Sequence, residues 1–229
     1  MRWGEHWRIS RDTYLPKKSL IFQLGSIMPD WFDRHPIHRW VDTKDLFLDR
    51  VCKVAEMKPG IKRDWLLGFT AHFICDYCCL AHNDQYYDLY RHRVYEVLSQ
   101  KYDKKKRKNG PKQIEKWMNA IDCSFMYLGD ESNSGSGEAG SCHEGGTGNN
   151  SNNGNNGSKN GSINDVSELR EKVCYAVEQC IKKLHAEIAA LNSEEWSRDA
   201  RIMKLDIEYS YALLKTVLRL LENLENKQY

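Results

Sequence analysis

The sequence predicts an all-α protein, and three observations lead to this prediction. Apolar residues recur at intervals of three and four along most of the chain, as at Val173, Val177 and Ile181. No stretch alternates between apolar and polar residues with the period of a β-strand. Helix-breaking residues, such as Pro29 and the Lys-Pro-Gly segment 58–60, separate the periodic stretches. A bundle of several helices is therefore expected.

The N-terminal part of the chain is expected to form two short helices. Residues 1–15 form the first, from about the second residue onward. The apolar run that follows is ended by Gly25 and Pro29, because proline breaks a helix, and this places Asp30 on a turn. The residues around Pro36 are expected to be irregular for the same reason.

The central part of the chain is expected to contain three longer helices. An amphipathic pattern spans residues 43–57, and the Lys-Pro-Gly segment ends it. Two further helices are expected at 61–80 and 84–102. The basic run at 104–111 is expected to end the third helix as a solvated connection; the alternative is a transient contact with an anionic membrane surface.

The C-terminal half is expected to contain three more helices and one insertion. Periodic apolar residues predict helices at 112–128, 164–191 and 193–225. Residues 130–162 are almost entirely Gly, Asn and Ser, which cannot bury enough apolar surface to offset the entropy of folding. We therefore expect one helical domain over residues 1–229, interrupted by a disordered Gly/Asn/Ser-rich insertion.

The composition excludes several classes of protein. A formal net charge of +2 gives no general argument for nucleic-acid binding. No apolar run is long enough for a transmembrane segment, and the N-terminus lacks the apolar core of a signal peptide. As written, the chain is expected to be cytoplasmic, or secreted if a leader precedes it. The eight cysteines are expected to be reduced packing thiols; the alternative reading of Cys75-x2-Cys78 is half a zinc knuckle or a redox pair.

One stretch, from Gly68 to Glu96, is unusually rich in metal-binding residues. It has the order His-x3-Asp-x5-His-x9-His-x3-Glu, supplied by His72, Asp76, His82, His92 and Glu96. Residues four apart share one face of a helix, so the first two and the last two each form a pair of neighbouring ligands. Five ligands exceed what one tetrahedral zinc uses, so the pattern predicts a cluster of metals. The middle histidine joins the others if the helix ends near Ala81.

The alternative interpretation is that these residues are ordinary polar side chains. A single His-x3-Asp pair on a helix is commonly exposed, and His185, which lies among lysines, is expected to be a surface histidine. Two pairs with apolar neighbours such as Phe73 and Val94 favour burial, however. A buried imidazole or carboxylate needs a partner or a metal, because burying it alone is costly.

This pattern resembles the core signature of the bacterial zinc-dependent phospholipase C family, an all-helical bundle related in fold to zinc-dependent single-strand nucleases. The family also has a histidine near its N-terminus, an Asp after a Gly/Pro turn, and a His followed by an aromatic residue and Asp. The positions that resemble these are His6, Asp30 in GSIMPD and His38 in HRWVD. The resemblance is specific over about residues 3–100.

The resemblance implies two to three Zn2+ ions. One would be held by Asp30, His38, His72 and Asp76, one by His82, His92 and Glu96, and a third by His6 with Asp76 as bridge. The second ion would have three protein ligands and an open position. Asp30 is the first candidate for general base and Glu5 the second. Two departures from the secreted enzymes of the family are visible. Those enzymes bind their third zinc through an N-terminal Trp, whereas here Trp3 follows Met1 and Arg2. The spacing from His82 to His92 is also shorter than in those enzymes.

The implied function is hydrolysis of a phosphodiester, most simply cleavage of a phospholipid to diacylglycerol and a phosphorylated headgroup by a zinc-activated water. Two alternatives remain open at this point. One is a nuclease or phosphatase that uses the same metal site, with aromatic residues such as Trp40 stacking on bases. The other is a non-catalytic helical protein stabilised by metal. The sequence predicts no oligomeric state.

Overall fold

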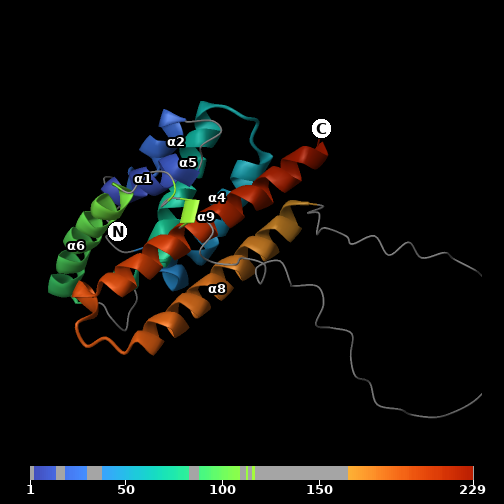
Figure 1. Ribbon diagram of the computed structural model, residues 1–229. Coiled ribbons are helices and arrows are strands. Elements are labelled where there is room, and N and C mark those ends of the chain that lie inside the picture. The colour runs from blue at the N-terminus through green and yellow to red at the C-terminus, as the bar shows by residue number, and fades with distance from the viewer. Residues whose placement is uncertain are drawn as a thin grey trace, which may run out of the picture.

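The computed structural model describes residues 3–13, 19–29, 38–82, 88–108 and 165–228, with three isolated positions between 112 and 116. Within these residues every regular element is an α-helix or a 3-10 helix, so the fold is all-α as predicted (Figure 1). The predicted insertion at 130–162 and most of the predicted helix at 112–128 lie outside the described residues.

The described elements follow the predicted order along the chain. They are α1 (Trp3–Thr13), α2 (Leu20–Gly25), α4 (Trp40–Glu56), α5 (Ile61–Tyr77), the 3-10 turn η1 (Leu80–His82), α6 (Leu89–Arg107), α8 (Val166–Leu191), the 3-10 turn η4 (Trp196–Arg198) and α9 (Ala200–Gln228). None of these helices has a stretch both long and apolar enough to span a membrane.

Helix α6 differs from its predicted bounds at both ends. It begins at Leu89, because the carboxylate of Asp88 accepts a hydrogen bond from the amide of Arg91 at 2.8 Å and so caps the first turn. It continues through Arg107, five residues beyond the predicted end at 102. The prediction that the basic run forms a connection from residue 104 is therefore wrong for its first four residues, which belong to the last turn of the helix. Cations are favourable there because they face the negative end of the helix dipole.

Helices α4 and α9 also begin at other residues than predicted. Helix α4 starts at Trp40, three residues early, since only Pro36 and not the residues after it disfavours a helix. Helix α9 starts at Ala200, seven residues late, because residues 196–198 form the separate turn η4. Asp199 then accepts a hydrogen bond from the amide of Arg201 at 2.8 Å, which satisfies one of the first amides of α9.

Two glycines allow α2 and α5 to cross with their backbones in contact. A Cβ atom added to Gly25 would collide with the carbonyl oxygen of Trp65, and one added to Gly68 would collide with that of Phe22. Any larger residue at either position would force the helices apart. The crossing matters for the site described below, because it brings the backbone that follows α2 against the side chains of α5.

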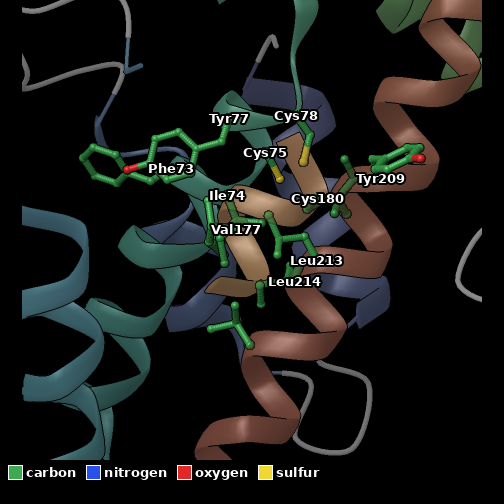
Figure 2. Close-up of a cluster of buried hydrophobic side chains, with 14 of the residues drawn as sticks. Phe73, Ile74, Cys75, Tyr77, Cys78, Val177, Cys180, Tyr209, Leu213 and Leu214 are labelled. Atoms are coloured by element: carbon green, nitrogen blue, oxygen red, sulfur yellow. The ribbon is translucent and has the colours of Figure 1, made fainter. Parts of the chain in front are cut away.

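The hydrophobic core lies where α5 meets the two long C-terminal helices. Helices α8 and α9 lie side by side, and α5 packs against α9 (Figure 1). Figure 2 shows Ile74 of α5 among side chains of both, including Val177 of α8 and Leu213 of α9, all of them fully buried. Burial of each such side chain contributes about 1.5–3 kcal/mol. The C-terminal helices therefore hold α5, the helix that carries His72 and Asp76, in a fixed position.

The buried cysteines are packing residues, as predicted. Cys75, Cys78 and Cys180 are buried in the core shown in Figure 2. Burial raises the pKa of the Cys75 and Cys78 thiols well above the ordinary value, so both stay protonated and unreactive at neutral pH. Neither thiol belongs to a group of potential metal ligands within the described part of the chain, so the zinc-knuckle alternative has no support there.

Candidate metal centre

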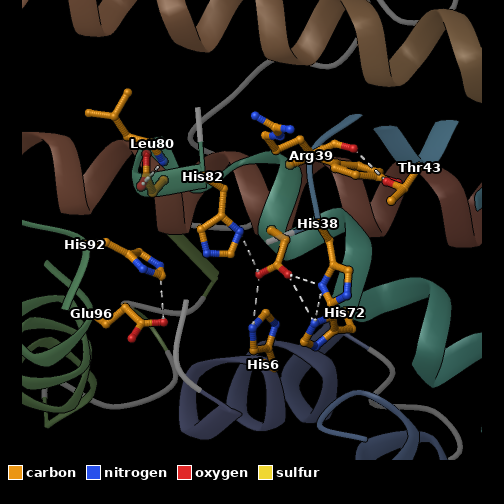
Figure 3. Close-up of polar contacts among 12 residues, drawn as sticks. His6, His38, Arg39, Thr43, His72, Leu80, His82, His92 and Glu96 are labelled. Atoms are coloured by element: carbon orange, nitrogen blue, oxygen red, sulfur yellow. Dashed lines mark hydrogen bonds and ion pairs between the residues drawn. The ribbon is translucent and has the colours of Figure 1, made fainter. Parts of the chain in front are cut away.

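Seven of the predicted ligands lie within the described residues, and side chains from five segments converge on one region. Figure 3 shows the rings of His6, His38, His72 and His82 turned toward one another, with His92 and Glu96 beside His82. All four rings lie within 3.5 Å of the carboxylate of Asp76. We call His6, His38, His72 and Asp76 the Asp76 group, and His82, His92 and Glu96 the Glu96 group. The segments that supply them are α1, the residues before α4, α5, η1 and α6.

Asp76 is the centre of the arrangement. It is only 1% exposed, and each of its oxygens faces two imidazoles. Oδ2 lies 2.8 Å from Nδ1 of His38 and 3.1 Å from Nε2 of His72. Oδ1 lies 3.4 Å from Nε2 of His6 and 3.5 Å from Nδ1 of His82. One carboxylate that serves ligands on both sides has the position of a bridge between two ions, which is the role predicted for Asp76.

The orientation of His72 is set by the close crossing of α2 and α5. Its Nδ1 lies 2.9 Å from the carbonyl oxygen of Ser26, the residue after α2. A carbonyl only accepts hydrogen bonds, so Nδ1 carries the proton and, in the neutral ring, Nε2 presents a lone pair. That lone pair faces a carboxylate oxygen of Asp76 at 3.1 Å. Two electron-rich atoms at this distance need a positive charge between them, which either a proton or a metal ion supplies, so the arrangement is compatible with a bound metal.

The ionisation of the centre also fits a metal. Burial by itself raises the pKa of Asp76, but the imidazoles of His82 and His72 and the hydrogen bond from His38 outweigh it and hold this pKa well below its ordinary value. Burial also lowers the pKa of His82 well below its ordinary value, so this ring releases its proton readily when a metal takes the place of that proton. An anionic carboxylate and a neutral imidazole are the protonation states that bind zinc.

The Glu96 group forms where α5 ends. Helix α5 stops at Tyr77, three residues before its predicted end at 80, and η1 then turns the chain so that His82 faces His92 with ring centroids 5.1 Å apart. The prediction that a helix break turns His82 inward is thus confirmed, with the break at Cys78. One ligand atom from each of the three residues lies within 4.8 Å of the others. Glu96 is the most exposed of the predicted ligands that the structure describes, with its side chain 21% accessible, so solvent reaches this group.

The structure groups His6 differently from the predicted three-ion scheme. Ligand atoms of His6, His72 and Asp76 lie within 4.8 Å of one another, and the rings of His6 and His72 stack at 4.2 Å. The scheme joined His6 to the centre through Asp76 alone. His38 also lies 3.1 Å from Nε2 of His72, as expected for ligands of one ion. How these residues divide among ions stays a prediction.

Of the two predicted catalytic residues, the structure describes only Glu5. Asp30 lies outside the described residues. Glu5 is fully buried and accepts a hydrogen bond from the hydroxyl of Ser99 at 2.6 Å, which ties α1 to α6. The ion pair between Arg8 and Asp103 joins the same two helices. These contacts hold the helix that carries His6 against the helix that carries the last two ligands.

His185 is a residue that the sequence reading assigned to the surface. It is half-buried and, with Arg39, Trp40 and Ile181, lines a cavity of about 130 Å³ that reaches Asp76 and His82. Burial lowers its pKa. The available signal was its spacing from Ile181, because residues four apart lie on one face of a helix and that face of α8 packs inward.

Comparison with known proteins identifies the family. Residues 7–131 match the family of zinc dependent phospholipase C, which is more than half of the chain. The chain belongs to the zinc-dependent phospholipase C family. No curated protein and no solved structure matched it. The matched range contains every ligand named above except His6, which lies one residue before it, whereas α8 and α9 lie beyond its end.

Family membership and the geometry of the site both indicate zinc as the metal and a hydrolase as the general class of protein. Imidazole nitrogens and carboxylate oxygens are ligands that zinc uses in catalytic sites, and both ligand groups consist only of these. A family of zinc-dependent phospholipases places the protein among zinc hydrolases.

Proposed function

We propose that the protein is a zinc-dependent phosphodiesterase that cleaves a phospholipid to diacylglycerol and a phosphorylated headgroup. The observation that carries this proposal is the single buried carboxylate of Asp76, which lies between a closed ligand group and a second, solvent-accessible one. A metal that only stabilised the fold would need one closed group.

The Glu96 group would hold the ion at which reaction occurs. Its three protein ligands leave a fourth position open, and Glu96 is the ligand nearest to solvent. Bound zinc supplies hydroxide near neutral pH and stabilises the negative charge of the phosphate in the transition state. The Asp76 group would hold the remaining zinc and keep the buried imidazoles oriented. Asp30 remains the proposed general base, and Glu5 is less suited, because its carboxylate already accepts the hydroxyl of Ser99.

The cavity beside the centre has the features of a substrate site. Its walls include the apolar side chains of Trp40, Val41 and Ile181, which would contact the apolar part of a lipid. Arg39 and His185 add hydrogen-bond donors, which are suited to a phosphate oxygen. Lipid hydrolysis needs both an apolar wall and phosphate donors, so the cavity supports this substrate class.

We therefore expect His185→Leu, which removes the donor, to raise KM by about 5- to 20-fold, since one hydrogen bond to a charged group contributes about 1–2 kcal/mol. Zinc content should not change, because His185 belongs to neither ligand group. Steady-state kinetics and elemental analysis on the same samples measure both. Lys182→Gln is the matched control, since it removes a basic side chain from the exposed face of the same helix. Equal KM values for the two variants would exclude His185 from the substrate site.

The proposed function is tested by incubating the zinc-loaded protein with phosphatidylcholine vesicles, single-stranded DNA and a chromogenic phosphodiester. We expect diacylglycerol and phosphorylated headgroup from the vesicles, together with hydrolysis of the chromogenic compound. Cleavage of DNA alone would replace the proposal with nuclease activity. Hydrolysis of none of the three would leave a non-catalytic, metal-stabilised protein.

A further inference from the structure

A buried carboxylate on α9 contacts the two segments that carry the Glu96 group. Asp206 is fully buried, and α9 lies beyond the range that matches the family. Its Oδ2 accepts a hydrogen bond from the backbone amide of Leu80 at 2.9 Å and a second, short one from the hydroxyl of Tyr95. Leu80 is labelled in Figure 3 on the turn that leads to His82.

The two donors to Asp206, Leu80 and Tyr95, lie close to the residues of the Glu96 group along the chain. Leu80 is the first residue of η1 and His82 is the last. Tyr95 lies on α6 between His92 and Glu96. A single oxygen atom is therefore bonded to the turn that presents one ligand and to the helix that presents the other two. Any shift of η1 relative to α6 would stretch at least one of these bonds.

Burying the carboxyl group of Asp206 costs folding free energy, which a purely structural contact would not need. Burial raises its pKa to about 7, although the hydrogen bonds from Tyr95 and Leu80 lower it. Its Oδ1 is buried and has no hydrogen-bond partner among the residues that the structure describes. A buried carboxyl with one oxygen unsatisfied stabilises a fold less than an apolar side chain of the same size. The presence of Asp206 is thus better explained by a role in positioning η1 and α6 through its hydrogen bonds from Leu80 and Tyr95.

We propose that Asp206 is a positioning residue that sets the separation between His82 and the His92/Glu96 pair for a divalent cation. The proposal rests on the metal-binding part of the proposed function and is independent of the substrate. Metal sites depend on such partners, whose loss typically weakens metal affinity about 10- to 100-fold. Asp206 acts one step further out, through the backbone and through Tyr95, so the lower end of that range is expected.

The test uses variants of the full-length protein that remove single hydrogen bonds. Tyr95→Phe removes only the hydroxyl that donates a hydrogen bond to Asp206. Asp206→Asn replaces the acceptor carboxylate with an amide. Tyr211→Phe is the matched control, because the Tyr211 hydroxyl donates another buried hydrogen bond from α9, to Asp12 on α1 at 2.9 Å, and this bond involves neither η1 nor α6, the two segments of the Glu96 group. Zinc affinity is measured by competition with a chromophoric chelator, and Co2+ loading adds an absorption spectrum that reports ligand geometry.

We expect Tyr95→Phe and Asp206→Asn each to weaken the binding of one zinc by about 10-fold and to change the Co2+ spectrum, while the remaining zinc binds normally. The double variant should lose no more zinc affinity than Asp206→Asn alone, since both substitutions break the same Tyr95–Asp206 hydrogen bond. Tyr211→Phe should lower the melting temperature without changing metal binding.

The outcomes separate this proposal from the function it rests on. Zinc affinities and spectra of Tyr95→Phe that equal those of Tyr211→Phe would show that Asp206 has only a structural role. That comparison decides the matter even if Asp206→Asn does not fold. A wild-type protein that binds no zinc at all would overturn the metal centre itself, and with it this proposal.

Discussion

The purified protein is expected to carry two to three zinc ions per chain, and Asp76→Asn is expected to remove more than one of them. The reason is geometric: Oδ2 of Asp76 serves His38 and His72, and Oδ1 serves His6 and His82. An amide in its place offers one weaker oxygen ligand and an NH2 group, which cannot bind a cation. Loss of the predicted bridge is therefore expected to disturb both ligand groups together.

Native mass spectrometry and elemental analysis measure this result. His72→Ala should also lose more than one ion, because its ring contacts Asp76 and His38 and stacks on His6. Glu208→Gln is the control, since Glu208 is another buried carboxylate, paired with Lys204 of its own helix and outside both ligand groups. It should keep the full zinc content. A carefully prepared wild-type protein with one zinc or none would contradict the cluster.

Glu96→Gln is expected to leave a folded protein whose phosphodiesterase activity is lower by about 100-fold or more. Glu96 is one of only three protein ligands proposed for the reacting ion, so loss of its charge should weaken that ion and the hydroxide it supplies. The fold should persist, because the buried Asp76 group still joins α1, the start of α4 and α5. Fold and chemistry should therefore separate in this variant.

Circular dichroism, zinc content and initial rates on a chromogenic phosphodiester test this expectation together. Glu222→Gln, a change at an exposed position of α9, is the control and should retain wild-type rates. Chelation should abolish turnover in the wild type, and added zinc should restore it. Wild-type rates in Glu96→Gln, or turnover that survives complete chelation, would exclude the Glu96 group as the site of reaction.

The sequence by itself determined the features that depend on neighbours along the chain. Helical periodicity predicted the all-α fold, because a helix with one buried face has apolar residues at intervals of three and four along the sequence. The pairs His72/Asp76 and His92/Glu96 were predictable for the same reason. The boundaries of α6 and α9 were predicted less well, since the capping bonds of Asp88 and Asp199 compete with the apolar pattern.

Only the tertiary structure decided how these local pieces meet. The stacking of His6 on His72, the contact of Ser26 with His72 and the place of His185 in the cavity all join residues from different helices. Asp206 lies 126 residues from Leu80 and 111 from Tyr95. A hydrogen bond across such a separation follows from the packing of whole helices and leaves no periodic pattern in the chain. The candidate ligands could therefore be predicted from the sequence, whereas the side chains that hold them at their distances could not.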